Sequence, residues 1–427
     1  MEELEAMATQ NNPTLAQADA AVRAAEGRRR QAGLWPNPVV GYFAEELAFR
    51  NPGETSEHGV FIEQNILLGG KLSKARRVMA REVEQSQTIA EAQRLRVLNS
   101  IRVLYFETLG AQRLVELRGD LARLTREAVE ITAELHNVGQ ADTPDQLGIE
   151  IEAERAAIEL LQAHTDWEQS WRTLSAMIGK PDLSPGRLAG NLEEQEMTLD
   201  QETILSTLLR DSPELRVAQT GVARAQAVID RARAERIPDL FVRGGVGYNY
   251  ERIEPIPPQV LSGRKGWESR LEFGITLPIF NRNQGGIATA EAEQAIAERD
   301  LQRLQLLLRS RFASAFREYR HSQQIVEKYR TQIIPRARRA YEMYLSNFSQ
   351  MAASYPQVLI AQRTLFQVEV EYARALIGMR QSLVGIRGFL LTGGLEGIAR
   401  PGELGGEGTE GFQLRTPNEV TGDSDNP

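Results

Sequence analysis

The chain has 427 residues, a formal net charge of −8 and no cysteine. The missing cysteines exclude disulfides, thiolate metal sites and cysteine nucleophiles. The acidic balance, with no block of Lys and Arg residues, argues against binding to nucleic acid. Aromatic residues make up only 6% of the chain, a composition that favours long helices over compact mixed sheets.

The start of the chain, MEELEAMATQ, lacks the basic and apolar regions of a secretory signal peptide. No stretch of the sequence reaches the ~18 consecutive apolar residues of a membrane-spanning helix. Two alternatives remain: the protein stays in the cytosol, or an export signal was removed, so that the signal peptide is not present in this chain. The predicted architecture favours the second.

The two halves of the chain resemble each other. Pro13 recurs 200 residues later as Pro213, and the spacing from Phe61 to Pro144 recurs 212 residues later without an insertion. Such internal repetition indicates a duplicated architecture. We predict a first structural repeat over residues 12–190, a connector over 191–210, a second repeat over 211–392 and a disordered tail over 393–427.

Each half has the same order of elements. A short helix comes first, opened by Asn12 or Ser212 before a Pro in the first turn. Two extended segments follow, then a helix of about 65 residues, a turn, and a return helix that begins near Pro144 or Pro356. The predicted ranges are helices 13–33, 72–138, 213–236 and 286–348, and strands 39–47, 59–66, 240–250 and 267–277.

The long helices carry a repeating apolar seam. In the first half, apolar residues alternate at intervals of three and four from Leu114 to Val138, which is typical of a coiled coil. The same register recurs in the second half with one polar interruption, at Arg336. Pro335 lies inside the second long helix and is expected to kink it.

The fourth extended segment shows the clearest strand pattern. Apolar residues share one face, while Glu268, Arg270 and Glu272 share the other. Four strands cannot close a barrel, whereas a trimer would supply twelve. The alternation fits both a lipid-facing barrel strand and a half-buried strand of a soluble sheet. In the barrel reading, the residues on the lipid face are Trp267, Leu271, Phe273 and Ile275.

Three motifs resemble the TolC family of outer-membrane efflux proteins. They are LPIFNRNQGG (277–286), QNILLGGK (64–71) and IIPRARRAYEMY (333–344), and with the duplicated element order they cover the chain to about residue 392. The second motif departs from the family pattern, with Ile66 in place of a Pro. The first motif also resembles the CzcC-like heavy-metal branch.

The resemblance implies a mainly α fold with a small β part. It implies duplicated long coiled-coil hairpins and four membrane β-strands per protomer, forming a trimeric 12-stranded barrel and a periplasmic α-helical tunnel. The homotrimer would lie in the outer membrane of a Gram-negative bacterium, in contact with its lipid, and serve a periplasmic adaptor and an inner-membrane pump of RND type. It would be a passive duct, and the resemblance to the heavy-metal branch implies heavy-metal cations as cargo, with drug efflux or type I secretion as the alternative. The lipid-bearing N-terminal Cys of metal-exporting relatives is absent from this sequence.

The two turns at the hairpin tips are the candidate sites. Asp142 and Asp145 at the first tip would form rings of acidic residues at a periplasmic entrance, or alternatively cap the return helix. Gln357 and Ile360 stand where the resemblance leads us to expect acidic residues at the second tip. We expect adaptor docking beside the turns, at Gly139, Gln140, Pro144, Gln350 and Pro356.

The sequence offers no catalytic, cofactor-binding or metal site, so we do not expect an enzyme or a bound cofactor. An enzyme with a helical hairpin insertion therefore lacks a candidate active site. An elongated soluble coiled-coil scaffold or adaptor remains as an alternative from another class. It would share the helices but would have no need for four strands of bilayer length.

Overall fold

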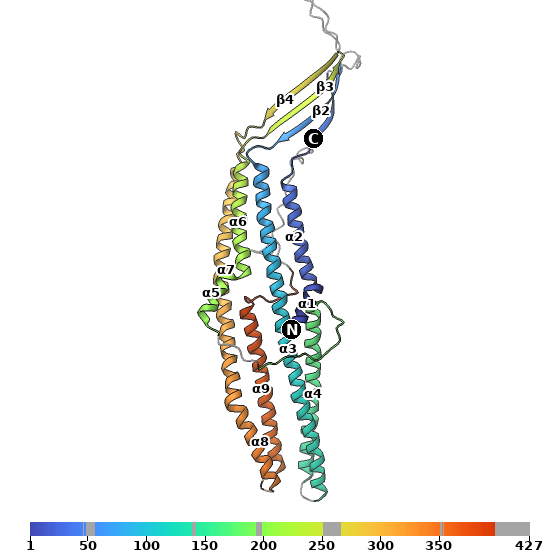
Figure 1. The fold of residues 1–427 in the computed structure, drawn as a ribbon, viewed down its shortest axis with the longest axis vertical. Coiled ribbons are helices and arrows are strands. Elements are labelled where there is room, and N and C mark those ends of the chain that lie inside the picture. The colour runs from blue at the N-terminus through green and yellow to red at the C-terminus, as the bar shows by residue number, and fades with distance from the viewer. Residues whose placement is uncertain are drawn as a thin grey trace, which may run out of the picture.

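The long helices form an elongated stalk with a small sheet at one end (Figure 1). The computed structural model describes residues 1–45, 47, 56–138, 142–193, 199–250, 266–350, 352 and 354–397. The helices and strands are α1 (Glu2–Asn11), α2 (Pro13–Ala32), β1 (Val39–Glu45), β2 (Glu57–Ile66), α3 (Lys71–Asn137), α4 (Thr143–Ile178), α5 (Gln201–Asp211), α6 (Pro213–Ala234), β3 (Leu240–Asn249), β4 (Gly266–Ile275), α7 (Gln284–Lys328), the π-helical turn η1 (Tyr329–Ile333), α8 (Ile334–Ser349) and α9 (Tyr355–Arg387).

The helix α3 is the longest helix of the first half, and the other helices of that half pack along it. Its 67 residues correspond to about 100 Å at 1.5 Å per residue. Shorter helices lie along it: α2 on the half nearer the sheet and α4 on the half nearer the tip (Figure 1). The side chain of Asn12 joins the two, because its Nδ2 donates to the Met177 carbonyl at 2.8 Å while its Oδ1 accepts from Thr14 N. The short opening helix α2 therefore stacks end to end with the return helix α4.

The second half repeats this arrangement with α6 and α9 beside α7–η1–α8 (Figure 1). The predicted long helix is interrupted by η1, which ends two residues before Pro335. Proline has no N–H and its ring crowds the carbonyl four residues earlier, so a widened turn here relieves a conflict that a regular α-helix would retain. A π-turn thus lies just before Pro335, the residue at which the sequence predicts a kink.

Two helices lie outside the ranges predicted to be helical. Helix α1 precedes α2, and α5 precedes α6, so another helix comes before each predicted opening helix. Residues 201–210, assigned to the connector, form most of α5. Asp200 caps this helix by accepting from Thr203 N at 2.9 Å and from the Thr203 hydroxyl at 2.6 Å, and these bonds lower the pKa of the Asp200 carboxyl.

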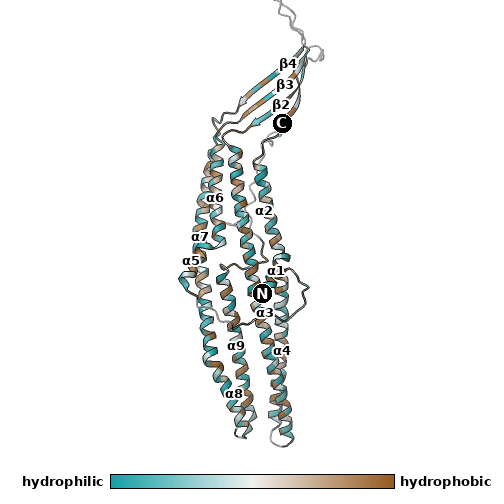
Figure 2. Ribbon diagram, viewed as in Figure 1, coloured by the Kyte–Doolittle hydropathy of each residue, from teal (hydrophilic) through white to brown (hydrophobic). Residues whose placement is uncertain are grey.

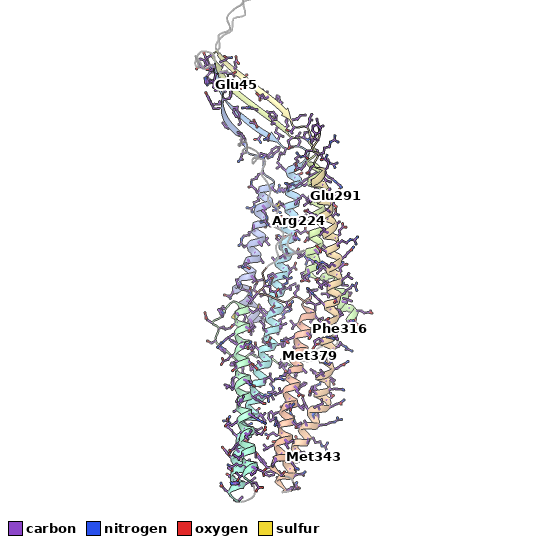
Figure 3. All side chains as sticks on the ribbon, turned by 180° about the vertical axis from the view of Figure 1, so that it is seen from behind. Glu45, Arg224, Glu291, Phe316, Met343 and Met379 are labelled. Carbon is purple, nitrogen blue, oxygen red and sulfur yellow. The ribbon has the colours of Figure 1, made fainter. Side chains whose placement is uncertain are left out.

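The main core lies at mid-height, where α1, α3, α4 and α9 meet the connector. Ala8, Val97, Ile101 and Ile178 are completely buried there. A second cluster around Phe316 joins α5, α7 and α9, and Figure 3 shows its position on the stalk. None of the described helices combines the length and apolarity needed to cross a bilayer.

The apolar seam of α3 differs from the predicted heptad. Leu117, Leu121 and Ala128 are buried as expected, but Ile131 and Val138 are exposed, and Thr132 is buried in the same stretch. A straight α-helix has 3.6 residues per turn, so its buried stripe drifts away from a strict seven-residue repeat. The drift leaves apolar side chains outside the intramolecular core.

Residues 388–397 form a strap across the middle of the stalk. Asn99 Nδ2 donates to the carbonyls of Gly388 and Leu391, at 2.7 and 3.3 Å. The Gly394 amide donates to Ser100 Oγ, and the Gly394 carbonyl accepts from Thr14 and Gln93. Residues 393–397, at the start of the tail predicted to be disordered, are thus held by buried hydrogen bonds; residues 398–427 lie outside the described part.

Candidate functional site

The sheet has one apolar face and one charged face. Its strands lie in the order β1-β2-β3-β4, each antiparallel to its neighbour. The register aligns Val60 with Val246 on one face and Phe61 with Gly245 on the other. The alternation of brown and teal along the strands in Figure 2 shows the same division. Because strand side chains alternate between faces, this register sorts apolar and charged residues across all four strands.

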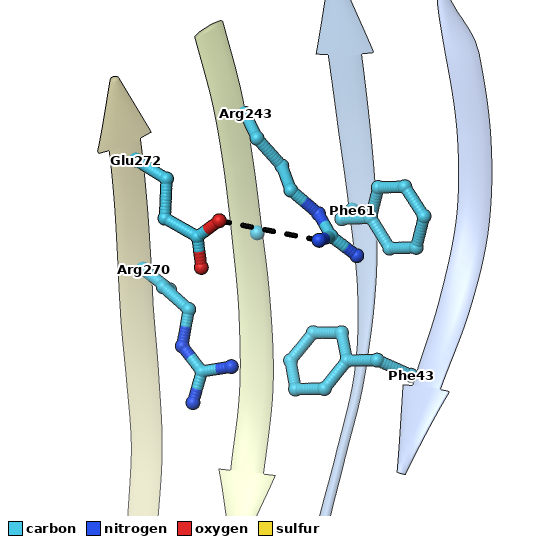
Figure 4. Close-up of a pocket in the computed structure, with 6 residues that line it drawn as sticks. Phe43, Phe61, Arg243, Arg270 and Glu272 are labelled. Atoms are coloured by element: carbon cyan, nitrogen blue, oxygen red, sulfur yellow. Dashed lines mark ion pairs between the residues drawn. The ribbon is translucent and has the colours of Figure 1, made fainter. Parts of the chain in front are cut away.

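The charged face is held by ion pairs that cross the sheet. Arg270 on β4 contacts Glu45 on β1 at 2.5 Å and Glu57 on β2 at 3.3 Å. Arg243 on β3 lies 3.9 Å from Glu272 on β4. Figure 4 shows these arginines beside two phenylalanine rings. A single guanidinium therefore links the first strand of the sheet to the last.

Two phenylalanines lie flat within this charged face. The Arg243 guanidinium carbon is 3.8 Å from the centre of the Phe61 ring, and that of Arg270 is 5.2 Å from the centre of Phe43. These distances are those of cation–π contacts. Phe43, Phe61, Arg243, Gly245, Arg270 and Glu272 together line a shallow depression on this face.

Glycines make room for the rings. A Cβ on Gly41 would lie 2.4 Å from Cζ of Phe61, and one on Gly59 would lie 2.5 Å from Cζ of Phe43. The Gly59 Cβ would also meet the Val246 carbonyl oxygen at 2.6 Å. Each ring thus occupies the place of a missing side chain on the neighbouring strand, which fixes the pairing register.

The apolar face is uncovered. Trp267 is 78% exposed and Phe273 66% exposed, and Leu271 and Ile275 beside them on β4 are also exposed. Val40, Tyr42, Val60 and Ile62 continue this exposed surface onto β1 and β2. The four residues predicted to face lipid therefore share one exposed face; their contact with lipid stays a prediction.

The first tip joins α3 to α4. Gly139 and Gln140 lie outside the described residues. Pro144 occupies the first turn of α4, and Asp142 stands at the N-cap position with an extended backbone but with no capping hydrogen bond from its side chain. Asp145 is exposed in the first turn, where its negative charge interacts favourably with the positive end of the helix dipole. The carboxylate of Asp142 is therefore at the end of the stalk without serving as a cap.

The second tip joins α8 to α9 at the same end of the molecule (Figure 1). Gln350, Pro356 and Gln357 are exposed there, and Ile360 is 66% exposed. Phe348 and Tyr355 close the turn with ring centres 5.0 Å apart, a contact that the sequence alone did not indicate. Burial raises the pKa of the Tyr355 hydroxyl. Met343, labelled in Figure 3, lies close to this tip.

The π-turn η1 is linked to α9 by one hydrogen bond. The Tyr329 hydroxyl donates to Glu371 Oε2 at 2.7 Å, and this bond raises the pKa of the phenol. The tilted Tyr329 and Tyr372 rings have centres 6.5 Å apart. These contacts fix the widened turn against the neighbouring helix.

The sequence identified only part of the charged face. The strand pattern predicts that Glu268, Arg270 and Glu272 share a face opposite the apolar residues, and the register confirms that grouping and adds Arg243 beside Glu272. Glu45, Glu57, Phe43 and Phe61 were missed, because β1 and β2 alternate less clearly. A usable signal was the one glycine on each of these strands, two residues before a phenylalanine: Gly41 before Phe43, and Gly59 before Phe61.

Comparisons with known proteins agree with this architecture. The profile of the family described as "Outer membrane efflux protein" matches residues 4–180 and 204–390, once in each half. The cobalt-zinc-cadmium resistance protein CzcC of Cupriavidus metallidurans is 25% identical over 374 residues, which cover 87% of this chain and 84% of CzcC. The pyoverdine export outer membrane protein OpmQ of Pseudomonas putida is 22% identical over 414 residues, or 90% of this chain and 84% of OpmQ.

The fold is also that of solved channel structures. The open state of the MtrE outer membrane channel of Neisseria gonorrhoeae superposes with a TM-score of 0.74 at 17% identity, covering 91% of this chain and 88% of MtrE. The predicted mainly helical fold with a small antiparallel sheet is thereby confirmed. The family match spans most of the chain, both of its hairpins and all four strands. The chain belongs to the outer membrane efflux protein family.

Proposed function

We propose that the chain is one protomer of a homotrimeric duct in the outer membrane. In this proposal it is the exit component of a tripartite efflux system. An inner-membrane pump of RND type would deliver heavy-metal cations to it through a periplasmic adaptor. The observation that carries the proposal is a four-stranded sheet with an exposed apolar face, an opposite charged face and two open edges.

The open edges support assembly into a barrel. β1 and β4 each pair with a single neighbour among the described strands. In lipid, unpaired backbone groups are too costly to persist, so these edges must pair with further strands. Three copies joined β4 to β1 give twelve strands, with the apolar face toward lipid and the charged face toward the lumen.

Exposed apolar residues on the stalk support the trimer independently. On α4 they occur at intervals of four, seven and three, at Leu147, Ile151, Ile158 and Leu161, all at least 53% exposed. This spacing is that of a coiled-coil stripe. Such a stripe on a single copy is suited to packing against a neighbouring copy's helices.

The charge of the lumen-facing side supports cations as cargo. Among the described strands this face carries two arginines, Arg243 and Arg270, and five acidic residues: Glu45, Glu57, Glu63, Glu268 and Glu272. An excess of negative charge along a narrow path concentrates cations and repels anions. The similarity to CzcC supports heavy metals; the similarity to OpmQ supports export of an organic molecule as a second candidate. Drug efflux and type I secretion remain further alternatives within the family.

The tips are the proposed entrance. The exposed Asp142 and Asp145 would form a ring of acidic residues around the axis of a trimer. Adaptor helices would dock beside Pro144 on the first tip, and beside Gln350 and Pro356 on the second. The protein itself performs no chemical step in this scheme, so choice of cargo rests largely with the pump.

The decisive experiment has two parts. The full-length protein, with an export signal, is extracted from outer-membrane fractions in detergent and imaged as single particles. Elongated trimers with a hollow stalk support the duct, whereas monomers in the soluble fraction would establish the scaffold alternative. In a strain deleted for the gene, complementation restores resistance to cobalt, zinc and cadmium if the cargo is metal; restored export of siderophores alone would favour the second candidate.

A further inference from the structure

We propose that the junction between sheet and stalk binds the headgroups of anionic phospholipids. This junction, here called the collar, carries the apolar side chains Trp35, Leu277, Ile279 and Phe280 and the arginines Arg76, Arg77, Arg236 and Arg282. The proposal rests on the placement of the sheet in a membrane. It adds a lipid class and a set of residues to that placement.

The apolar part of the collar is unusually exposed. Phe280 is 92% exposed, Trp35 59%, and Leu277 and Ile279 58% each. Large apolar side chains gathered at one level of a protein mark an interaction surface. Leu277 and Ile279 also continue the alternation of Phe273 and Ile275 beyond the end of β4. The collar is therefore continuous with the face proposed to contact lipid.

Basic residues gather at the same level. Arg76, Arg77, Arg236 and Arg282 are all exposed, and no carboxylate lies within salt-bridge distance of them in the described part of the chain. By contrast, Lys71 in the same region is paired with Asp239 at 2.7 Å. These four arginines therefore present positive charge at the level of the exposed apolar side chains.

The sequence at this level also runs against the helix dipole. Helix α3 begins with Lys71 and Lys74, and its first turn contains no acidic residue. The first turn of α7 lacks acidic residues as well. The positive end of the dipole normally favours Asp or Glu there. Lys74 thus adds a positive charge at this level, whereas the charge of Lys71 is balanced by Asp239 and Glu235.

Contacts between the helix ends hold the collar at one level. A Cβ on Gly33, after α2, would lie 3.1 Å from Cδ of Arg76 on α3. Asn283 Nδ2, before α7, donates to the Ala232 carbonyl at the end of α6 at 2.9 Å. The Leu68 amide donates to Asp239 at 3.0 Å. The ends of α2, α3, α6 and α7 nearest the sheet are thus fixed together directly below it (Figure 1).

The chemistry of the collar matches a membrane surface. Aromatic side chains suit the boundary between acyl chains and headgroups, and arginines beside them attract phosphate-bearing headgroups. At the other end of the apolar face, Tyr248 and Trp267 have ring centres 5.8 Å apart. Ten-residue strands such as β4 span roughly 25 Å of bilayer when tilted, so the two zones lie at opposite interfaces.

The test uses the detergent-purified full-length protein and vesicles of phosphatidylcholine, alone or mixed with phosphatidylglycerol. We expect tighter association with the mixed vesicles, and a weaker preference as salt is raised. The variant carrying Arg76→Gln, Arg77→Gln, Arg236→Gln and Arg282→Gln is expected to lose this preference by about tenfold or more, from about fivefold per basic residue before screening. The corresponding four Arg→Lys substitutions should retain it.

A matched control removes four exposed arginines of the stalk, by Arg94→Gln, Arg309→Gln, Arg317→Gln and Arg339→Gln, and should bind like the unmodified protein. Equal association with both vesicle types, or an unchanged preference in the collar variant, overturns the proposal. If the collar variant does not assemble, the salt dependence of the unmodified protein decides. Failure to insert into either vesicle type would instead refute the membrane placement itself.

Discussion

Arg243 on β3 holds its guanidinium 3.8 Å from the centre of the Phe61 ring on β2. The ring in turn occupies the space that a side chain on Gly41 of β1 would need. The charged face of the sheet is therefore built in layers: a glycine, a ring and an arginine. A face made this way is polar at its surface and closely packed beneath it.

Because the rings pack directly on glycines, a single added methyl group should strongly lower the stability of the sheet. Gly59→Ala should destabilise the assembled protein by about 1–3 kcal/mol, because the new Cβ would meet a backbone oxygen at 2.6 Å and a ring carbon at 2.5 Å. Gly244→Ala on β3 is the control, since its nearest neighbour would be 3.9 Å away. The stability of each variant is measured as the temperature at which the detergent-solubilised assembly dissociates. Equal dissociation temperatures for the two variants would show that the sheet relaxes around the methyl group added at Gly59.

The charged face should set ion selectivity. Arg270→Gln removes one of its two positive charges and leaves Glu45 and Glu57 without this partner. We expect the ratio of cation to anion permeability in planar bilayers to rise by about twofold or more, and Glu272→Gln to lower it. Ser269→Ala, on the opposite face of β4, should leave the reversal potential unchanged. A shift of the same size in all three variants would place the selectivity elsewhere.

The strap should depend on a buried amide. Asn99→Leu removes the buried amide that donates to the carbonyls of Gly388 and Leu391, so that Gly388 keeps only the Leu391 amide as donor, a loss of about 1–3 kcal/mol. We expect limited proteolysis to cleave residues 388–397 faster in this variant than in the unmodified protein, while the cleavage rate at the tips stays the same. Gln302→Ala, on an exposed face of α7, serves as the control. Protection of the strap in the Asn99 variant would contradict its assigned role.

The hydrogen bond at the π-turn predicts a dependence on alkaline pH. The bond to Glu371 raises the pKa of Tyr329 in the folded protein above its unfolded value of about 10. The stabilisation is therefore complete below the unfolded pKa and is lost as pH rises through the folded one. Tyr329→Phe should lower the unfolding free energy by about 1 kcal/mol at neutral pH and flatten the alkaline decline. Parallel curves for the two proteins would rule out this contribution.

The tips should be required for export but not for assembly. Replacing residues 139–144 and 350–356 by scrambled turns of the same length is expected to abolish export while the amount of assembled protein in the outer membrane stays the same. The reason is that docking depends on side chains at the turns, whereas assembly depends on the stalk and sheet. Asp142→Asn with Asp145→Asn tests the acidic ring separately, by the conductance for divalent cations. Full export by the scrambled protein would place adaptor docking elsewhere.

Much of the fold was readable from local pattern. The bounds of α3 and β3 differ by about one residue from the predictions, because helix and strand periods and the Pro and Gly signals at their ends are properties of short segments. Helix α1 escaped prediction, although Leu4 and Ala8 lie buried one turn apart. The helix is stabilised by packing into the core at mid-height of the stalk, and the sequence of a ten-residue segment does not show such tertiary contacts.

The sequence by itself determined the duplication, the long hairpins, the four strands and the alternation that separates apolar from charged residues. The tertiary structure decided which of those residues meet. Arg270 reaches Glu45, 225 positions away, only because three successive strand registers bring them onto one face. The tertiary structure likewise left Ile131 outside the core that the heptad predicted, through the drift of a straight helix. Periodicity is encoded locally, whereas partners are set by register and by the direction in which whole helices pack, and those emerge only when the chain is assembled.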